Sequence, residues 1–199
     1  SRINAYGAGR GIRILHYINS SGLKEIIEGT EIAHEFRRIY ACSFLYDVDG
    51  IAYWPAVAVN YTNKTQFIFK INKGVESVFD SKLVNQYIEE DKRPVPFRRM
   101  IYVGDGLSDV PCMKMMRAYG GQAIAVYQAG NRVGVEDLLS KGRVDFIFPA
   151  DYREGTGLDS TVKNIIRKMA ISDALTAENV QQLQAIGRGD LPEQVGLFE

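Results

Sequence analysis

Short apolar runs along this chain alternate with longer segments in which apolar residues recur every three or four positions. The short runs are rich in β-branched and aromatic residues, which is typical of buried strands. They lie at residues 12–18, 41–59, 101–103, 123–127 and 144–148. Helical periodicity is found at residues 23–36, 66–73, 82–89, 112–119, 133–141, 158–169 and 176–186. This alternation predicts an α/β fold, with a mostly parallel sheet and helices on both of its faces.

Residues 41–59 depart from the alternation, because two apolar runs there are separated by the dipeptide Asp49-Gly50. Such a dipeptide between apolar runs is a strong signal for a β-hairpin. The same turn chemistry accounts for Asp47 and Asp49 without any catalytic role. We therefore expect one domain over residues 1–186 with a β-hairpin insertion, followed by a loose C-terminal tail at 187–199.

Two carboxylates lie at the end of the apolar strand 101–103. Glycines at 104 and 106 break the strand, so Asp105 lies at its carboxyl end and Asp109 at the start of the next helix. Ligands bind at this edge in open α/β sheets, and two converging carboxylates would bind a hard cation such as Mg²⁺. The alternative is that Asp109 only caps the helix.

Two other segments carry residue types that bind anions. Asn19-Ser20-Ser21-Gly22 follows a strand and precedes a helix, so backbone amides, the helix dipole and the Ser20 hydroxyl would face a bound anion. The alternative is that one of these serines only caps the helix. Lys64 lies at a helix start, where the dipole disfavours a cation, and we expect it to face carboxylates and a phosphate. Lys70 and Lys73, at the far end of that helix, are expected at the surface.

Composition narrows the possible partners. Lys and Arg total 24 residues and Asp and Glu also total 24, so no long-range field favours nucleic acid or an anionic membrane. No apolar run approaches the length of a membrane span, and no signal peptide is recognisable. Cys42 and Cys112 lie in apolar segments and are expected to be free thiols. These features predict a cytoplasmic protein.

The stretch Gly104-Asp105-Gly106-Leu107-Ser108-Asp109 resembles the GDxxxD motif of the haloacid dehalogenase superfamily, and most closely its phosphoserine-phosphatase-like branch. Ser20 and Lys64 occur in the order of that family's second and third motifs. The resemblance implies a Rossmann-like core and a Mg²⁺-dependent phosphatase that hydrolyses a phosphorylated small molecule through a phosphoaspartyl intermediate. It also implies site residues of two kinds: Asp105 and Asp109 for the metal, and Ser20, Ser21, Gly22 and Lys64 for the phosphoryl group.

The first motif of that family, which carries the nucleophilic aspartate, does not precede Ser20. Asp47-Val48-Asp49-Gly50 imitates this motif but follows Ser20, against the family order. We therefore expect the chain to be the C-terminal part of a longer phosphatase, without the nucleophile strand and the cap. Either strands 12–18 and 100–104 then close up, or another chain or the missing N-terminal segment completes the sheet. Two alternatives remain: a non-catalytic remnant that binds Mg²⁺ and anions, and a flavodoxin-like nucleotide-binding module.

Overall fold

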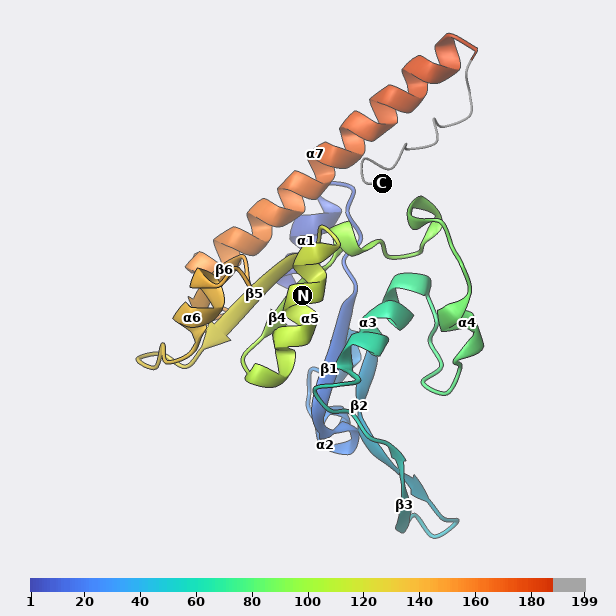
Figure 1. The fold of residues 1–199 in the computed structure, drawn as a ribbon, viewed down its shortest axis with the longest axis vertical. Helices are drawn as coiled ribbons and strands as arrows, with labels where there is room; N and C mark the ends of the chain where they lie inside the picture. The colour runs from blue at the N-terminus through green and yellow to red at the C-terminus, as the bar shows by residue number, and fades with distance from the viewer. Residues whose placement is uncertain (188–199) are drawn as a thin grey trace.

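The structure is a computed structural model that describes residues 1–187, and it has a Rossmann-like α/β fold with two three-stranded sheets (Figure 1). The strands of the first sheet are β1 (His16–Leu23), β2 (Phe36–Tyr46) and β3 (Ala52–Val57). Those of the second are β4 (Ile101–Gly104), β5 (Gln122–Tyr127) and β6 (Phe146–Pro149). All neighbouring strands are parallel except β2 and β3, which form the predicted antiparallel hairpin. The predicted fold class is confirmed.

Helices cover both faces of the second sheet. The helices of the described chain are α1 (Arg2–Ala8), α2 (Lys24–Glu28), α3 (Lys64–Lys73), α4 (Lys82–Asn85), α5 (Val110–Ala118), α6 (Val135–Ser140) and α7 (Gly157–Ala185), of which α3, α5, α6 and α7 pack on this sheet. Side chains of β5 alternate between the two faces. Ala123 and Ala125 pack with residues of α3, α5 and α6, whereas Ile124 and Val126 pack against α7. The long helix α7 runs past the sheet at one end of the molecule (Figure 1).

Several element boundaries differ from those expected. The helix predicted at 23–36 ends at Glu28, because Gly29 ends it and the Thr30 hydroxyl donates to the Ile27 carbonyl. The chain then makes a 3₁₀ turn at Ala33–Glu35 and enters β2. The helices predicted at 158–169 and 176–186 form the single helix α7. No glycine or proline interrupts the sequence between them.

The two sheets do not merge. β1 pairs only with β2 and β4 only with β5, so within residues 1–187 no ladder joins β1 to β4. The two strands therefore do not close up, although that was one of the two expected outcomes. Their apolar side chains are incompletely covered: Val103 in β4 is 39% exposed, whereas Ile124 in β5 is fully buried. Parallel strands are normally buried on both faces, so β1 and β4 present open apolar edges.

Residues 75–99 connect α3 to β4 and are mostly exposed, but contacts at both ends of the segment hold it to the body of the protein. Phe97 is 1% exposed and stacks on Tyr119 of α5 at a centroid distance of 4.9 Å, while its edge meets Phe69 of α3 at 5.3 Å. Lys70, expected at the surface, is 3% exposed and donates to the carbonyls of Ser77 and Asp80. The connector is therefore fastened to the body of the protein by one aromatic ring and one buried ammonium group.

Three other expectations concern the whole chain. Over residues 1–187, no helix has the length and apolar character needed to cross a membrane. Cys42 and Cys112 are free thiols, as predicted. The tail expected at 187–199 lies outside the described residues apart from Gly187.

Candidate functional site

Asp109, at the junction of β4 and α5, is the centre of a buried polar cluster. Its Oδ1 accepts hydrogen bonds from Lys64 Nζ at 2.8 Å and from the Tyr102 hydroxyl at 2.6 Å. Its Oδ2 accepts from the Gly106 amide at 3.3 Å. The side chains of Lys64 and Asp109 are only 6% and 8% exposed. Burial of two charges is tolerated here because each neutralises the other and further donors complete the shell.

Lys64 connects the two halves of the fold. It begins α3, whose preceding turn is fixed by an Asn60 amide that donates to Asn63 Oδ1. The Lys64 carbonyl accepts from Asn19 Nδ2 of β1 at 3.0 Å, while its ammonium reaches across to Asp109 and, at 3.3 Å, to the Ser108 hydroxyl. Lys64 therefore joins the middle of β1 to the carboxyl end of β4, and its pairing with Asp109 explains why a cation is tolerated at this helix start. The prediction that Lys64 faces a carboxylate is confirmed.

Glycine at position 104 is required by the close approach of Asp109. A Cβ at Gly104 would lie 2.8 Å from Asp109 Cβ, Cγ and Oδ2, which is closer than real side chains pack. The last residue of β4 must therefore lack a side chain for Asp109 to fold back over the strand end.

Asp105 differs from Asp109 in its exposure to solvent and in its hydrogen-bond partners. It is exposed, and within residues 1–187 its carboxylate has neither a hydrogen-bond donor nor an ion-pair partner. Tyr152, in the loop after β6, is near enough that the Asp105 charge adds to burial in raising the pKa of the Tyr152 phenol. Mg²⁺ is commonly held by one or two carboxylates together with waters and phosphate oxygens. Asp105 fits such a role, whereas both oxygens of Asp109 already have protein partners.

The segment carrying Ser20, Ser21 and Gly22 is not the expected turn. β1 continues through it to Leu23, and α2 is a helix of only five residues. The Ser20 hydroxyl accepts from the Gly22 amide at 3.0 Å, and Ser21 and Gly22 are exposed. An extended strand therefore replaces the expected turn at a helix N-terminus, and the Gly22 amide is occupied by the Ser20 hydroxyl.

Asp47 and Asp49 belong to the tip of the hairpin. Asp47 Oδ1 accepts from the amides of Asp49 and Ile51, and Gly50 has a φ of 76° that favours glycine. The turn interpretation of these two aspartates is supported, because the Asp47 carboxylate is occupied in holding the turn.

A metal centre needs more ligands than this edge supplies by itself. Among the described residues, no three His, Cys, Asp or Glu side chains come together in a group able to hold a metal ion. Any Mg²⁺ at this edge would therefore need ligands from water, a bound phosphate or a further polypeptide segment in addition to a carboxylate of this chain.

Tyr102 and Asn19 are the residues that sequence reasoning missed. Burial, followed by nearby Cys112 and Asp109, raises the pKa of the Tyr102 phenol far above its usual range, so it stays a donor to Asp109. Burial likewise raises the pKa of the Cys112 thiol to about 11, which makes it unreactive. Asn19 Oδ1 is buried with no donor among the described residues. The position of Tyr102, in a short strand seven residues before Asp109, was the one sequence feature that could have indicated its contact with Asp109.

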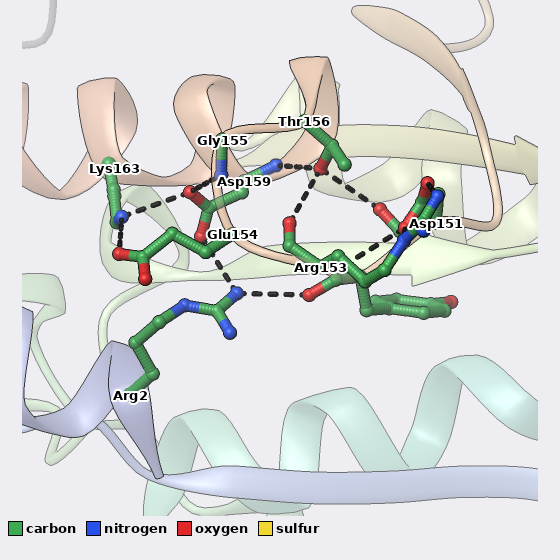
Figure 2. Close-up of polar contacts among 9 residues, drawn as sticks. Arg2, Asp151, Arg153, Glu154, Gly155, Thr156, Asp159 and Lys163 are labelled. Carbon is green, nitrogen blue, oxygen red and sulfur yellow. Dashed lines mark hydrogen bonds and ion pairs between the residues drawn. The ribbon is translucent and has the colours of Figure 1, made fainter.

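A second polar cluster fixes the loop between β6 and α7 (Figure 2). Arg2 reaches from α1 and donates to Asp159 Oδ1 and to the Tyr152 carbonyl, both at 2.9 Å. Lys163 Nζ lies 2.9 Å from Asp159 Oδ2, which also accepts from the Gly155 amide at 3.0 Å. Thr156 caps the helix by accepting from the Asp159 amide. This cluster holds α1 against α7 and positions the loop that carries Tyr152.

Comparison of the sequence with known proteins identifies a similar protein to which no activity is assigned. The chain is 30% identical over 159 residues to an uncharacterized protein of Borreliella burgdorferi. The match covers 71% of this chain and 54% of that protein, so the chain spans about half the length of the curated relative it matches. No family model matches the sequence.

The Asp159 cluster makes stability dependent on pH. The Gly155 amide, and after it Lys163 and Arg2, lower the pKa of Asp159 to about 2, against about 3.9 in an unfolded chain. A lowered folded-state pKa gives stability that is present above pH 4 and is lost as the pH falls to about 2. We expect Asp159→Asn to lower the melting temperature at pH 7, with the difference from the unchanged protein narrowing between pH 4 and pH 2.

Differential scanning calorimetry across that range measures this effect. Glu154→Gln is the matched control, because Glu154 is a 69% exposed partner of the same Lys163 and should change the melting temperature little. A difference between Asp159→Asn and the unchanged protein that stays constant from pH 7 to pH 2 would contradict the assignment.

Proposed function

We propose that this chain carries the phosphate-binding and Mg²⁺-binding part of a haloacid-dehalogenase-type phosphatase of the phosphoserine-phosphatase-like branch. Its substrate class is a phosphorylated small molecule, and the attacking aspartate is supplied by a segment outside the 199 residues. In the reaction, a carboxylate oxygen bonds to phosphorus as the alcohol leaves, and water then cleaves the phosphoaspartyl group to release phosphate.

The observation that carries the proposal is the buried Lys64 ammonium, held by Asp109 and Ser108 at the same sheet edge as Asp105. Phosphoryl transfer requires positioning and neutralisation of charge on phosphate oxygens more than it requires covalent chemistry by the protein. Lys64 supplies a fixed positive charge, and Asp109 together with Tyr102 orients it. In this proposal Asp109 is a positioning residue and Asp105 is the direct ligand.

Ser20 completes the phosphoryl site in this proposal. It follows Asn19, whose side chain donates to the Lys64 carbonyl, so the middle of β1 is joined to the start of α3. The hydroxyl of Ser20 and the amide of Ser21 would donate to phosphoryl oxygens there. Mg²⁺, when bound at Asp105, would supply the largest local charge and polarise the phosphoryl group.

The open edges of β1 and β4 support a nucleophile carried on an added strand. β4 ends beside Lys64 and β1 passes it at Asn19, so in this proposal one added strand lies parallel to both and ends beside Asp105. The half-covered side chains of β1 and β4, such as Val103, would then become buried. The encoded sequence ahead of Ser1 is the simplest observation: we expect an apolar strand that ends in an aspartate.

A non-catalytic protein that binds Mg²⁺ and anions is the second candidate. The specific observation in its favour concerns Asp47 and Asp49, which imitate the nucleophile motif: both lie at the hairpin tip, where the Asp47 carboxylate is occupied in holding the turn. The two candidate functions differ in whether a phosphate ester is hydrolysed. Both include Mg²⁺ binding by Asp105.

Substitution of Asp105 tests metal binding by the chain itself. We expect Asp105→Asn to weaken Mg²⁺ binding by roughly tenfold or more, measured by calorimetric titration of MgCl₂ in the presence of inorganic phosphate. Asp49→Asn is the matched control, because Asp49 is also exposed but lies at the hairpin tip. Equal Mg²⁺ affinity in Asp105→Asn and Asp49→Asn would overturn the assignment of Asp105.

Turnover of an aryl phosphate tests the position of the nucleophile. We expect the 199 residues alone to leave p-nitrophenyl phosphate unhydrolysed with Mg²⁺ present, and beryllium fluoride to add nothing to Mg²⁺ binding, since its tight complex requires the nucleophilic carboxylate. Hydrolysis at ordinary enzyme rates by this chain would contradict an external nucleophile.

A further inference from the structure

Two loops at the carboxyl edge of the second sheet each carry one large exposed apolar or aromatic side chain. These rim loops are residues 105–109 after β4 and residues 150–156 after β6, and both strands run parallel to β5, so the loops leave the sheet at the same edge. Leu107 is 81% exposed and Tyr152 is 61% exposed. Partial burial, and after it the charge of Asp105, raises the pKa of the Tyr152 phenol, so this ring lies near that carboxylate.

Leu107 borders the proposed phosphoryl site directly. The next residue is Ser108, whose hydroxyl accepts from Lys64 Nζ at 3.3 Å. The backbone around Leu107 is fixed, because the Asp109 amide donates to the Gly106 carbonyl at 3.0 Å and the Gly106 amide donates to Asp109 Oδ2 at 3.3 Å. The exposed leucine is therefore held in place beside the groups that would bind a phosphoryl oxygen.

The rim loop that carries Tyr152 is fixed as well. Arg2 donates to the Tyr152 carbonyl and to Asp159, which is 5% exposed, both at 2.9 Å (Figure 2). The Thr156 hydroxyl donates to the Asp151 carbonyl at 3.0 Å and accepts from the Asp159 amide at 3.2 Å. A side chain on a loop that is already ordered loses little conformational entropy when it contacts a ligand.

The charges of the rim loops are paired. Arg153, their only cationic residue, places Nε 2.9 Å from Asp151 Oδ1 and a terminal nitrogen 2.6 Å from Asp151 Oδ2. Glu154 lies 3.2 Å from Lys163 Nζ, and the buried ion pair at the junction of β4 and α5 is neutral in itself. Mg²⁺ would neutralise Asp105 in the proposed function. The rim loops then offer no unpaired charge to a charged group on a ligand.

We propose that the phosphorylated small molecule carries an uncharged apolar group, such as an aromatic ring, next to its phosphate, and that Leu107 and Tyr152 contact this group. This inference rests on the proposed function and adds the class of substrate. An aliphatic side chain and a flat ring together suit an apolar group. A carboxylate or an ammonium group at the same place would lose hydration without gaining a counter-charge, which disfavours charged substrates. Leu107 and Tyr152 are therefore specificity-determining residues.

Phosphonates test this class of substrate, because their carbon–phosphorus bond is not hydrolysed and they report binding alone. Calorimetric titration with MgCl₂ present compares phenylphosphonate, methylphosphonate, 2-carboxyethylphosphonate and 2-aminoethylphosphonate, at a pH where each phosphonate group is a dianion. We expect phenylphosphonate to bind about tenfold more tightly than methylphosphonate, and neither charged compound to bind more tightly than methylphosphonate. Equal affinity for all four compounds, or tightest binding of a charged one, would overturn the proposal.

Two variants assign the preference to the rim loops. Leu107→Ser and Tyr152→Ala should each lower the ratio of phenylphosphonate to methylphosphonate affinity to about threefold or less. Tyr87→Ala is the matched control, because Tyr87 is 82% exposed but belongs to the connector between α3 and β4, and it should leave the ratio at about tenfold. Circular dichroism checks that each variant is folded. A ratio that stays unchanged in both rim-loop variants contradicts the assignment of these two residues.

The same titrations separate failure of this inference from failure of the proposed function. If neither inorganic phosphate nor any phosphonate binds in the presence of Mg²⁺, the proposed function is wrong and the inference is wrong with it. If phosphate and methylphosphonate bind but the phenyl group adds no affinity, the proposed function stands and only the class of substrate is wrong.

Discussion

Replacing Asp109 with alanine is expected to lower the free energy of unfolding by about 3–5 kcal/mol. The reason is that Asp109 neutralises Lys64, whose side chain is only 6% exposed, and accepts a hydrogen bond from the Tyr102 hydroxyl. Removal of the carboxylate leaves a buried ammonium without its counter-charge and a buried phenol without an acceptor. Urea denaturation followed by circular dichroism measures the loss.

The control is the other aspartate of the same loop. Asp105→Ala removes an exposed carboxylate that has no partner within the described part of the chain, and its effect should stay within about 0.5 kcal/mol. Lys64→Met combined with Asp109→Leu should recover much of the loss, because removing both charges together leaves neither unpaired. If Asp105→Ala and Asp109→Ala destabilise equally, the buried ion pair does not have the role assigned to it.

Phe97→Ala is expected to lower the free energy of unfolding by about 3–5 kcal/mol as well. The ring is 1% exposed and contacts both α3, through Phe69, and α5, through Tyr119. Its loss removes apolar burial and leaves a cavity between the two helices that hold Lys64 and Asp109. Urea denaturation followed by circular dichroism measures this loss as well.

Phe79 provides the matched control for Phe97. It lies in the same connecting segment but is 73% exposed, so Phe79→Ala should change the free energy of unfolding by no more than about 0.5 kcal/mol. A similar loss in both variants would mean that the connector packs differently from the structure described here.

Local sequence signals predicted those elements whose conformation depends on residues adjacent in the chain. The hairpin follows from Asp49-Gly50 between apolar runs, because that dipeptide adopts the turn at no steric cost. The helix from Lys64 to Lys73 ends where Gly74 takes a φ of 69°, as expected for a glycine stop. The sequence failed at 23–36, where an apolar periodicity suited to a helix is divided between α2, a 3₁₀ turn and the start of β2.

Tertiary packing determined the burial of residues at which segments distant in the sequence come into contact. The residues around Phe97 are mostly polar, yet contacts from α3 and α5 bury its ring. Lys70, at the far end of α3, was expected at the surface, yet its ammonium is buried against the carbonyls of Ser77 and Asp80. Asp105 and Asp109 have the same local signature, and only the position of α3 makes one a buried counter-ion and leaves the other exposed.

By itself the sequence determined the α/β class, the hairpin and the candidate residues Ser20, Lys64, Asp105 and Asp109, because strand ends, turns and helix caps depend on residues close in the chain. Only the tertiary structure decided that Lys64 pairs with Asp109, that Asp105 has no protein partner within residues 1–187, and that no ladder joins β1 to β4 in that part of the chain. Those outcomes depend on contacts between segments more than forty positions apart, such as Lys64 with Asp109, which are 45 residues apart in the sequence and which no local pattern encodes.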